Sequence, residues 1–279
     1  MAIQMKPTSY FDPNGYFFSA SQCDQFDRCK KSWWYDKFSS IKPNNIEFFP
    51  FEYGNYVHDM LEACMEEKRD DWRINKMYDY MTTHPRSTKV NEYLGKNSIN
   101  HFIENGLVPR FKNLENVSQS CEISLGVKAP DNWFDEGYLD TFRQYYPNVE
   151  FIGFRGKIDY YGKDLKDGLI KIIDWKTGKP RKYKMKSYGE QVSQYAYLFN
   201  AHGYDFDAVS LYFVDAREEI SIDPDIDIGE TLIKDKLTRI IKYVQYQKDY
   251  PKNRSTDCNI CRYGLKCHKE DNVVLQMWG

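Results

Sequence analysis

Residues 151–178 read FIGFRGKIDYYGKDLKDGLIKIIDWKTG, and this stretch decides the fold. Two strand-like apolar runs flank a polar turn that is rich in Gly and Asp, and the three segments are 151–160, 162–168 and 169–176. This pattern predicts a β-hairpin. Residues two apart share one face of a strand, so Asp174 and Lys176 project together while Trp175 points the other way. We expect the hairpin to bring Asp159 of its first strand alongside Asp174.

Two carboxylates and an amine at a strand end have a chemical use. Carboxylates bind hard divalent cations, which commonly keep water ligands. Such a cation lowers the pKa of bound water, and a lysine orients the nucleophile or stabilises developing charge. The letters alone leave alternatives open. The chain also contains Asp164-Leu-Lys166, expected to be solvated surface, and an ion pair at a sheet edge would explain Asp174 and Lys176 equally.

Apolar spacing elsewhere predicts several further helices and strands. Ser19 opens the first helix with a capping box to Gln22. The expected helices are 19–38, 54–69, 185–200 and 231–248, with a broken helical stretch at 72–114; the further strands are 121–125 and 209–214. This order predicts an α/β protein with a central mixed β-sheet flanked by helices. Because no repeat, Pro-rich linker or low-complexity tract divides the chain, we expect one domain over 1–279.

Composition and charge limit the classes of protein to which this chain can belong. The 279 residues are 41% hydrophobic and 16% aromatic, which excludes a disordered chain. No apolar run approaches the ~20 residues of a membrane helix, and residues 1–20 resemble no signal peptide. A soluble cytoplasmic protein without membrane contact is expected. Residues 155–186 contain eleven basic and four acidic side chains, a local net charge of +7 against –2 overall. Either a polyanion or solvent can face such a segment.

The cysteines indicate a cluster or metal site. Three of the seven form a Cys258-x2-Cys261-x5-Cys267 group, one thiolate short of a full set. Cys29 is the best distant candidate for the fourth ligand, and His268 is the alternative. The remaining three stand among apolar neighbours and are expected to be small core residues: Cys23, Cys64 and Cys121.

Together these residues resemble the RecB-like branch of the PD-(D/E)XK nuclease superfamily. The motifs that carry the resemblance occur in the family's order: Gly54-x-x-Val57-His58, Gly156-Lys-Ile-Asp159, Ile173-Asp174-Trp-Lys176-Thr-Gly178 and Gln191-x-x-x-Tyr195. The cysteine arrangement is similar to that of iron–sulfur members such as the AddB nuclease domain, CRISPR-associated RecB-type nucleases and exonuclease V. The resemblance implies a restriction-endonuclease-like core at about 118–215, with a helical insertion at about 55–115. It also implies cluster-binding segments at about 19–38 and 255–270.

The resemblance further implies roles for individual residues. Lys176 is the catalytic lysine, and the metal site comprises His58, Asp159, Asp174 and the Trp175 carbonyl. Many members have Glu at the position of Asp174, and Glu122 is a candidate upstream acid. A 4Fe–4S cluster would join the N- and C-terminal segments through Cys29, Cys258, Cys261 and Cys267. The expected substrate contacts are Gln191 and Tyr195 and, following the lysine motif, the basic residues Lys179, Arg181, Lys182, Lys184 and Lys186.

The implied activity is a Mg²⁺- or Mn²⁺-dependent DNA exonuclease that acts on single strands or on ends. No G-x-x-x-x-G-K-[ST] phosphate loop occurs in the chain, so a stand-alone exonuclease is a better comparison than a helicase-fused one. The alternative is an inactive iron–sulfur or zinc protein that binds DNA or assembles other proteins. DNA is the expected partner, with replication or recombination proteins besides. A phage gene acting in host cytoplasm would suit the size of the chain.

Overall fold

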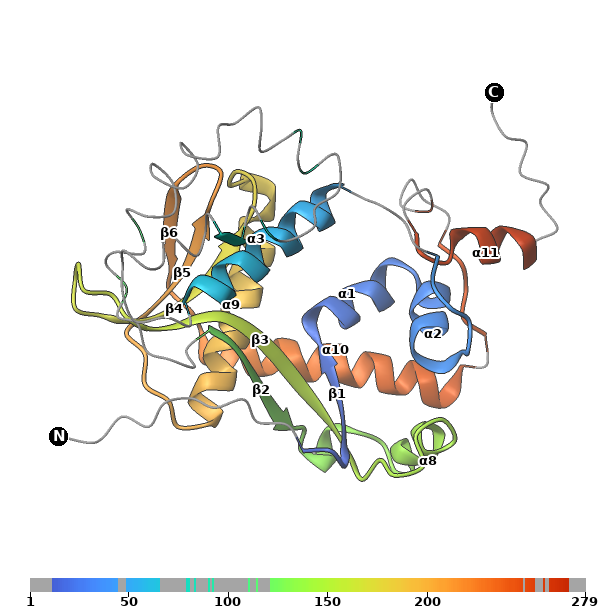
Figure 1. Ribbon diagram of the computed structural model, residues 1–279. Helices are drawn as coiled ribbons and strands as arrows, with labels where there is room; N and C mark the ends of the chain where they lie inside the picture. The colour runs from blue at the N-terminus through green and yellow to red at the C-terminus, as the bar shows by residue number, and fades with distance from the viewer. Residues whose placement is uncertain are drawn as a thin grey trace. The chain divides into compact units, whose positions relative to one another are not determined.

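The computed structural model describes residues 12–44, 49–65, 79–80, 83, 90, 92, 110, 114, 121–247, 249–253, 258 and 261–270. Its sheet has six strands in the order β1-β3-β4-β5-β6, and β2 also pairs with β3 (Figure 1). The strands are β1 (Gly15–Ser19), β2 (Cys121–Lys128), β3 (Phe151–Lys163), β4 (Ile170–Lys176), β5 (Ala208–Phe213) and β6 (Glu218–Ile222). The predicted α/β class with a mixed central sheet is confirmed.

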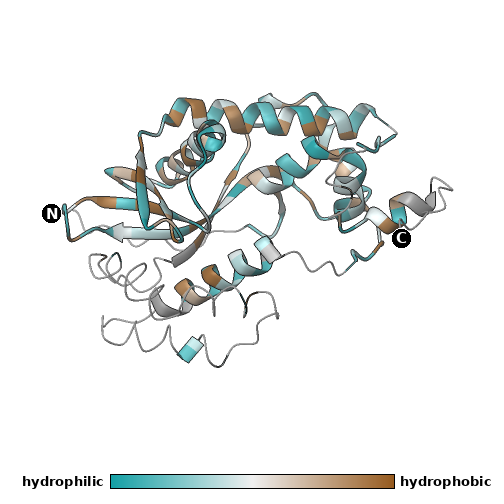
Figure 2. Cartoon of the chain, turned by 90° about the horizontal axis from the view of Figure 1, so that it is seen from above, coloured by the Kyte–Doolittle hydropathy of each residue, from teal (hydrophilic) through white to brown (hydrophobic). Residues whose placement is uncertain are grey.

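The helices account for most of the remaining described chain. They are α1 (Ala20–Arg28), α2 (Lys30–Phe38), α3 (Phe49–Met65), α8 (Tyr138–Arg143), α9 (Met185–Ala201), α10 (Ile226–Tyr246) and α11 (Gly264–Glu270), with short 3₁₀ turns η2 (Asp131–Trp133) and η3 (Lys182–Lys184). Apolar and polar bands alternate along α10 (Figure 2). Its apolar residues Leu237, Ile240, Ile241 and Val244 are buried. No described helix has both the length and the apolarity to cross a membrane.

The chain divides into two compact units. The first comprises 1–12, 49–127 and 155–233, and the second comprises 13–48, 128–154 and 234–279. Both β3 and α10 contribute residues to each unit. The expectation of a single domain stays a prediction.

The predicted hairpin is present as the antiparallel pair β3–β4. Its register runs from Tyr160↔Ile173 to Lys163↔Ile170. One position further, the same register sets Asp159 opposite Asp174. Strand β4 also pairs with β5 in parallel, which makes it central, and residues 171–175 are all buried. A strand covered on both faces explains why β4 shows no strict alternation of apolar and polar residues.

The first predicted helix is broken at Cys29. The capping box is confirmed, since Ser19 Oγ accepts from Gln22 N and Gln22 Oε1 accepts from Ser19 N. At Cys29 the backbone is extended, with φ –160° and ψ 105°, so two helices form where one was expected. Residues from far along the chain bond the backbone groups that the break frees. Asn253 donates to the Arg28 carbonyl, and Lys31 N donates to the Pro251 carbonyl.

Other element boundaries also differ from the sequence prediction. Helix α3 begins five residues earlier than expected, α10 begins at Ile226 rather than Thr231, and β1, β6 and α8 were not predicted. The expected apolar face of α3 is confirmed at Val57 and Leu61, both buried. Most of the stretch 72–114 lies outside the described residues. Cys23 is fully buried as expected, whereas the side chains of Cys64 and Cys121 lie outside the description.

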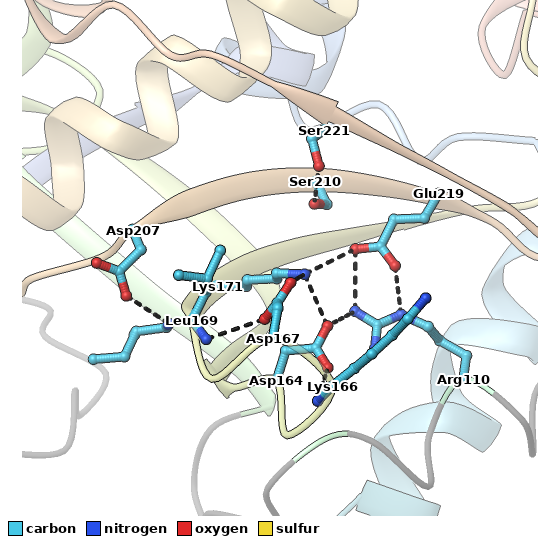
Figure 3. Close-up of polar contacts among 11 residues, drawn as sticks. Arg110, Asp164, Lys166, Asp167, Leu169, Lys171, Asp207, Ser210, Glu219 and Ser221 are labelled. Atoms are coloured by element: carbon cyan, nitrogen blue, oxygen red, sulfur yellow. Dashed lines mark hydrogen bonds and ion pairs between the residues drawn. The ribbon is translucent and has the colours of Figure 1, made fainter.

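A buried ionic network closes the turn of the hairpin (Figure 3). Lys171 Nζ lies 2.8 Å from Asp164 Oδ2 and 2.6 Å from Asp167 Oδ2. Arg110 reaches the same Asp164 oxygen at 3.0 Å, and its Nε lies 2.6 Å from Glu219 of β6. Burial lowers the pKa of Lys171, but the bonds to Asp164 and Asp167 outweigh it and raise the pKa. Asp164 is 1% exposed, so the prediction that it is solvated surface was wrong.

Gly156 on β3 lets α9 approach the sheet closely. A Cβ added at this position would lie 2.6 Å from Leu198 Cδ1 and 3.2 Å from the Tyr195 ring, both on α9. Glycine inside a strand commonly marks such a close approach. The contact brings the helix that carries Gln191 and Tyr195 against the strand that carries Asp159.

We expect Gly156→Ala to lower the free energy of unfolding by about 1–3 kcal/mol, because Leu198 and Tyr195 must shift to accept the methyl group. Gly189→Ala on α9 is the matched control. A Cβ there meets nothing within 4 Å, and alanine favours the helix by about 1 kcal/mol, so that variant should be as stable as wild type or more so. Urea unfolding of both variants measures the difference. Equal stability of Gly156→Ala and wild type would contradict the close approach.

Candidate active site

Six of the predicted site residues lie together in the first unit. They come from four elements: His58 from α3, Asp159 from β3, Asp174 and Lys176 from β4, and Gln191 and Tyr195 from α9. Each is joined to at least one other by a hydrogen bond or an ion pair. The spacing of the motifs along the chain therefore corresponds to one cluster in space.

The Asp174 carboxylate is at the centre of this cluster. Its side chain is almost fully buried, and Lys176 Nζ lies 2.6 Å from Oδ2. Oδ1 accepts hydrogen bonds from Gln191 Nε2 at 3.1 Å and from the Tyr195 hydroxyl at 3.2 Å. Burial raises the pKa of Asp174, even though Lys176 opposes the shift. Ionisation of Asp174 is therefore energetically costly in this buried position.

Gln191 links the lysine, the acid and the tyrosine. Its Oε1 accepts from Lys176 Nζ at 3.0 Å, while its Nε2 donates both to Asp174 and, at 2.6 Å, to the Tyr195 hydroxyl oxygen. Burial, followed by the Asp174 charge, raises the pKa of Tyr195 well above its ordinary value, so the phenol stays protonated and donates. The expected i, i+4 pair on one face of α9 is therefore part of the site's hydrogen-bond network.

Asp159 contacts both β4 and α3. Its Oδ2 accepts from the Trp175 N–H at 2.7 Å, and its Oδ1 lies 3.2 Å from His58 Nδ1. The Trp175 ring is buried and packs edge-on against Tyr212. Burial lowers the pKa of His58, but the hydrogen bond that the imidazole donates to Asp159 and the charge of that carboxylate outweigh it, so the net shift is upward. The imidazole is thereby biased toward its cationic form.

Two acids and two basic groups thus face one another. Burial lowers the pKa of Lys176, but Asp174 outweighs it and raises the pKa, which keeps the amine charged. Lys176 therefore compensates Asp174, and His58 compensates Asp159. A basic side chain thus stands beside each carboxylate, and its proximity offsets part of the cost of burying an acid.

The donor set fits a hard divalent cation. Asp174 Oδ2 is buried and accepts no hydrogen bond of good geometry from the described residues, although Lys176 Nζ lies close to it. Within the same described part, no three His, Cys, Asp or Glu side chains already form a metal-binding group. Two carboxylates still suffice to begin such a site, because hard cations complete their shell with carbonyl oxygens and water.

Two site residues were missed by the sequence analysis, Asp215 and its partner Tyr53. Asp215 follows β5; its Oδ1 accepts from the Tyr53 hydroxyl at 2.6 Å and its Oδ2 accepts from Gly178 N at 2.9 Å. Gly178 has φ +93°, a conformation that favours glycine. Asp215 therefore ties the turn after Lys176 to α3, the helix that carries His58. The feature that would have identified Asp215 is the parallel pairing of β4 with β5, because it brings the residues that follow both strands to one edge of the sheet.

Four of the predicted basic substrate residues lie on the segment that joins β4 to α9, and Lys186 lies in the first turn of α9. Lys179, Arg181, Lys182, Lys184 and Lys186 are all exposed. Arg181 Nη1 donates to the Tyr183 hydroxyl at 2.8 Å. Lys176 Nζ lies 5.7 Å from the Tyr188 ring centroid at the start of α9. The segment is thus anchored at both ends to elements of the candidate site.

The four predicted cluster cysteines all belong to the second unit. Their side chains are all of intermediate exposure: Cys29, Cys258, Cys261 and Cys267. Cys261 Sγ lies 3.7 Å from the Ser32 hydroxyl on α2, and Asn253 bonds the carbonyl of Arg28, next to Cys29. The side chains of His268 and Glu122 lie outside the described residues.

Comparison with solved structures gives distant similarities. The crystal structure of SSO0001 is 12% identical with a TM-score of 0.38, and the alignment covers 92% of this chain and 87% of that one. A candidate exonuclease from Eubacterium rectale is 12% identical with a TM-score of 0.47, covering 88% and 87%. Similarity at this level supports no conclusion about activity. No curated protein matches the sequence.

A family model gives the stronger result. The model of the PD-(D/E)XK nuclease superfamily matches residues 17–268, which is most of the chain and includes all six clustered residues. Asp174-Trp-Lys176 has the D-x-K spacing of the family's name, and the hairpin register sets Asp159 opposite Asp174. The chain therefore belongs to the PD-(D/E)XK nuclease superfamily.

Proposed function

We propose that this protein is a Mg²⁺- or Mn²⁺-dependent deoxyribonuclease that hydrolyses phosphodiester bonds as an exonuclease, on single strands or DNA ends. The observation that carries the proposal is the Asp159–Asp174–Lys176 cluster, in which Lys176 Nζ lies 2.6 Å from the buried Asp174. An exposed basic segment directly follows this lysine along the chain. Phosphate contacts of that kind position nucleic acid without reading its sequence.

Asp159 and Asp174 would hold the metal, with the Trp175 carbonyl as a further ligand and His58 beside Asp159. A bound divalent cation lowers the pKa of water and neutralises phosphate charge. Lys176 orients the attacking water and stabilises charge on the phosphate. The water oxygen bonds to phosphorus as the P–O bond to the leaving sugar breaks, and that sugar oxygen takes a proton. Gln191 and Tyr195 hold Asp174 and Lys176 in position through their hydrogen bonds.

Loss of Asp174 or Lys176 should reduce DNA cleavage by about 10²-fold or more, because each stabilises charge that develops in the transition state. The assay is metal-dependent digestion of end-labelled single- and double-stranded DNA by wild type, Asp174→Ala and Lys176→Ala. Lys166→Ala is the matched control, since this exposed lysine belongs to the other Asp-x-Lys of the hairpin. Activity retained in both site variants would refute the assignment. A folded wild type that binds DNA without cleaving it would favour the assembly-protein alternative.

Asp215 is proposed as a positioning residue. Asp215→Asn should lower kcat by about tenfold or more with little change in KM, because the turn after Lys176 loses a charged acceptor and small displacements of a catalytic group are costly. The control is Asp207→Asn. This carboxylate accepts the Ile170 N–H at 2.8 Å, at the opposite ends of β4 and β5. Equal kcat values for the two variants would mean that Asp215 only stabilises the fold.

We further propose that Cys29, Cys258, Cys261 and Cys267 hold one 4Fe–4S cluster, with His268 as the alternative fourth ligand. Support comes from the partial exposure of these four cysteines and from the hydrogen bond that joins Asn253 to the Arg28 carbonyl, next to Cys29, in the second unit. Thiolates suit iron–sulfur clusters and zinc alike.

Protein purified without oxygen should be brown and contain about four iron atoms per chain, the content of a single cluster of this type. Cys29→Ala and Cys261→Ala should lose most of that iron, whereas Cys23→Ala should keep it, because Cys23 is fully buried in the core. Elemental analysis for iron, sulfide and zinc measures the outcome. A colourless protein that contains zinc would refute the iron assignment, and iron retained in Cys29→Ala but lost in His268→Ala would refute the ligand set.

A further inference from the structure

We propose that Tyr183 is a stacking platform for an unpaired nucleobase, so that the segment 177–188 binds single-stranded rather than duplex DNA. This inference rests on the proposed nuclease function and names the form of its substrate. The platform consists of Tyr183 together with the exposed cations on either side of it along the chain.

Tyr183 is exposed to an unusual degree. Its side chain is 73% exposed, more than any other large hydrophobic side chain in the described part of the chain. The Arg181 guanidinium donates to its hydroxyl, and Lys184 N donates to the Arg181 carbonyl in the turn of η3. The ring is therefore held at its polar end while most of its surface faces solvent. An aromatic ring fixed in this way is prepared to stack on a flat partner.

The position of Tyr183 ties it to the cluster that would cut the strand. It stands seven positions after Lys176 of β4 and eight positions before Gln191 of α9. The turn between is anchored, because Asp215 holds Gly178 and because the Lys176 amine lies over the Tyr188 ring. A base stacked on Tyr183 thus belongs to a strand that passes close to these residues.

The charges around Tyr183 identify the partner as a polyanion. Residues 177–188 read TGKPRKYKMKSY, with five cations and no acidic residue. A basic segment with an aromatic side chain among the cations is typical of proteins that bind single strands, in which phosphates meet the cations and bases stack on the ring. A duplex offers the same phosphates but keeps the faces of its bases inside the helix. The ring therefore favours single strands, whereas the cations alone would not distinguish them.

The test separates base stacking from phosphate binding. Fluorescence anisotropy without divalent metal measures the Kd of wild type, Tyr183→Ala and Tyr183→Phe for a labelled oligothymidylate and for an abasic strand of equal length. Tyr183→Ala should bind the oligothymidylate about tenfold more weakly, the loss of one stacked base, with no change on the abasic strand. Tyr183→Phe keeps the ring but loses the bond from Arg181, so it should bind the oligothymidylate more tightly than Tyr183→Ala and no more tightly than wild type. The control is Tyr246→Ala, a tyrosine that is 60% exposed and bonded to Asp135, and it should change neither Kd.

Three results would overturn the proposal: unchanged affinity of Tyr183→Ala, an equal loss on the abasic strand, or wild type that binds neither strand. A polyglutamate peptide bound by wild type and weakened as much by Tyr183→Ala would instead assign the segment to an acidic protein partner. Cleavage with metal is scored separately. If wild type cleaves DNA but Tyr183 contributes nothing to binding, the stacking proposal is refuted and the nuclease function is retained. If binding depends on the bases but wild type does not cleave DNA, the nuclease function is refuted and the stacking proposal is retained.

Discussion

Burial of the Asp174 carboxylate against α9 is the constraint on which the rest of the candidate site depends. A buried carboxylate is expensive unless it is paired and hydrogen-bonded. Here Lys176 supplies the opposite charge, and Gln191 and Tyr195 supply the donors. Because Gln191 also accepts from Lys176, the position of the amine depends on the same helix. The acid and the lysine are thus ordered together by the docking of α9 rather than by the hairpin alone.

Buried carboxylates are paired differently at the two ends of the β3–β4 hairpin. At the turn, Asp164 is bonded by both Lys171 and Arg110, and Glu219 completes the network. At the other end, Asp174 Oδ2 lacks an aligned hydrogen-bond donor among the described residues, and burial raises the pKa of its carboxyl. Breaking a satisfied buried pair is strongly destabilising, so the first cluster favours one arrangement of the hairpin. The unsatisfied oxygen of the second is the feature that a cation would use.

Much of this site could be predicted from sequence because its parts are local. Residues two apart on β4 share a face, an antiparallel hairpin sets Asp159 opposite Asp174, and an i, i+4 pair meets on one turn of α9. The sheet class followed from the order of apolar runs. The predictions that failed concern features that depend on long-range contacts. The break at Cys29 depends on bonds from residues 251–253, and the burial of Asp164 depends on Arg110 and Glu219. No local pattern contains these partners.

Asp215 is a functional example of a residue that no local sequence pattern could identify. No residue near Asp215 in the sequence marks it as functional, because it is a single acid that follows a strand. Its role can be recognised only once β4 and β5 are known to run in parallel. That pairing places the ends of both strands at one edge, where a single carboxylate bonds the Gly178 turn and the Tyr53 hydroxyl of α3. Gly156 acts in a similar way on α9, because its missing side chain admits Leu198 and Tyr195. The strands supply the chemical groups, and these two contacts decide how closely the helices bring their partners to them.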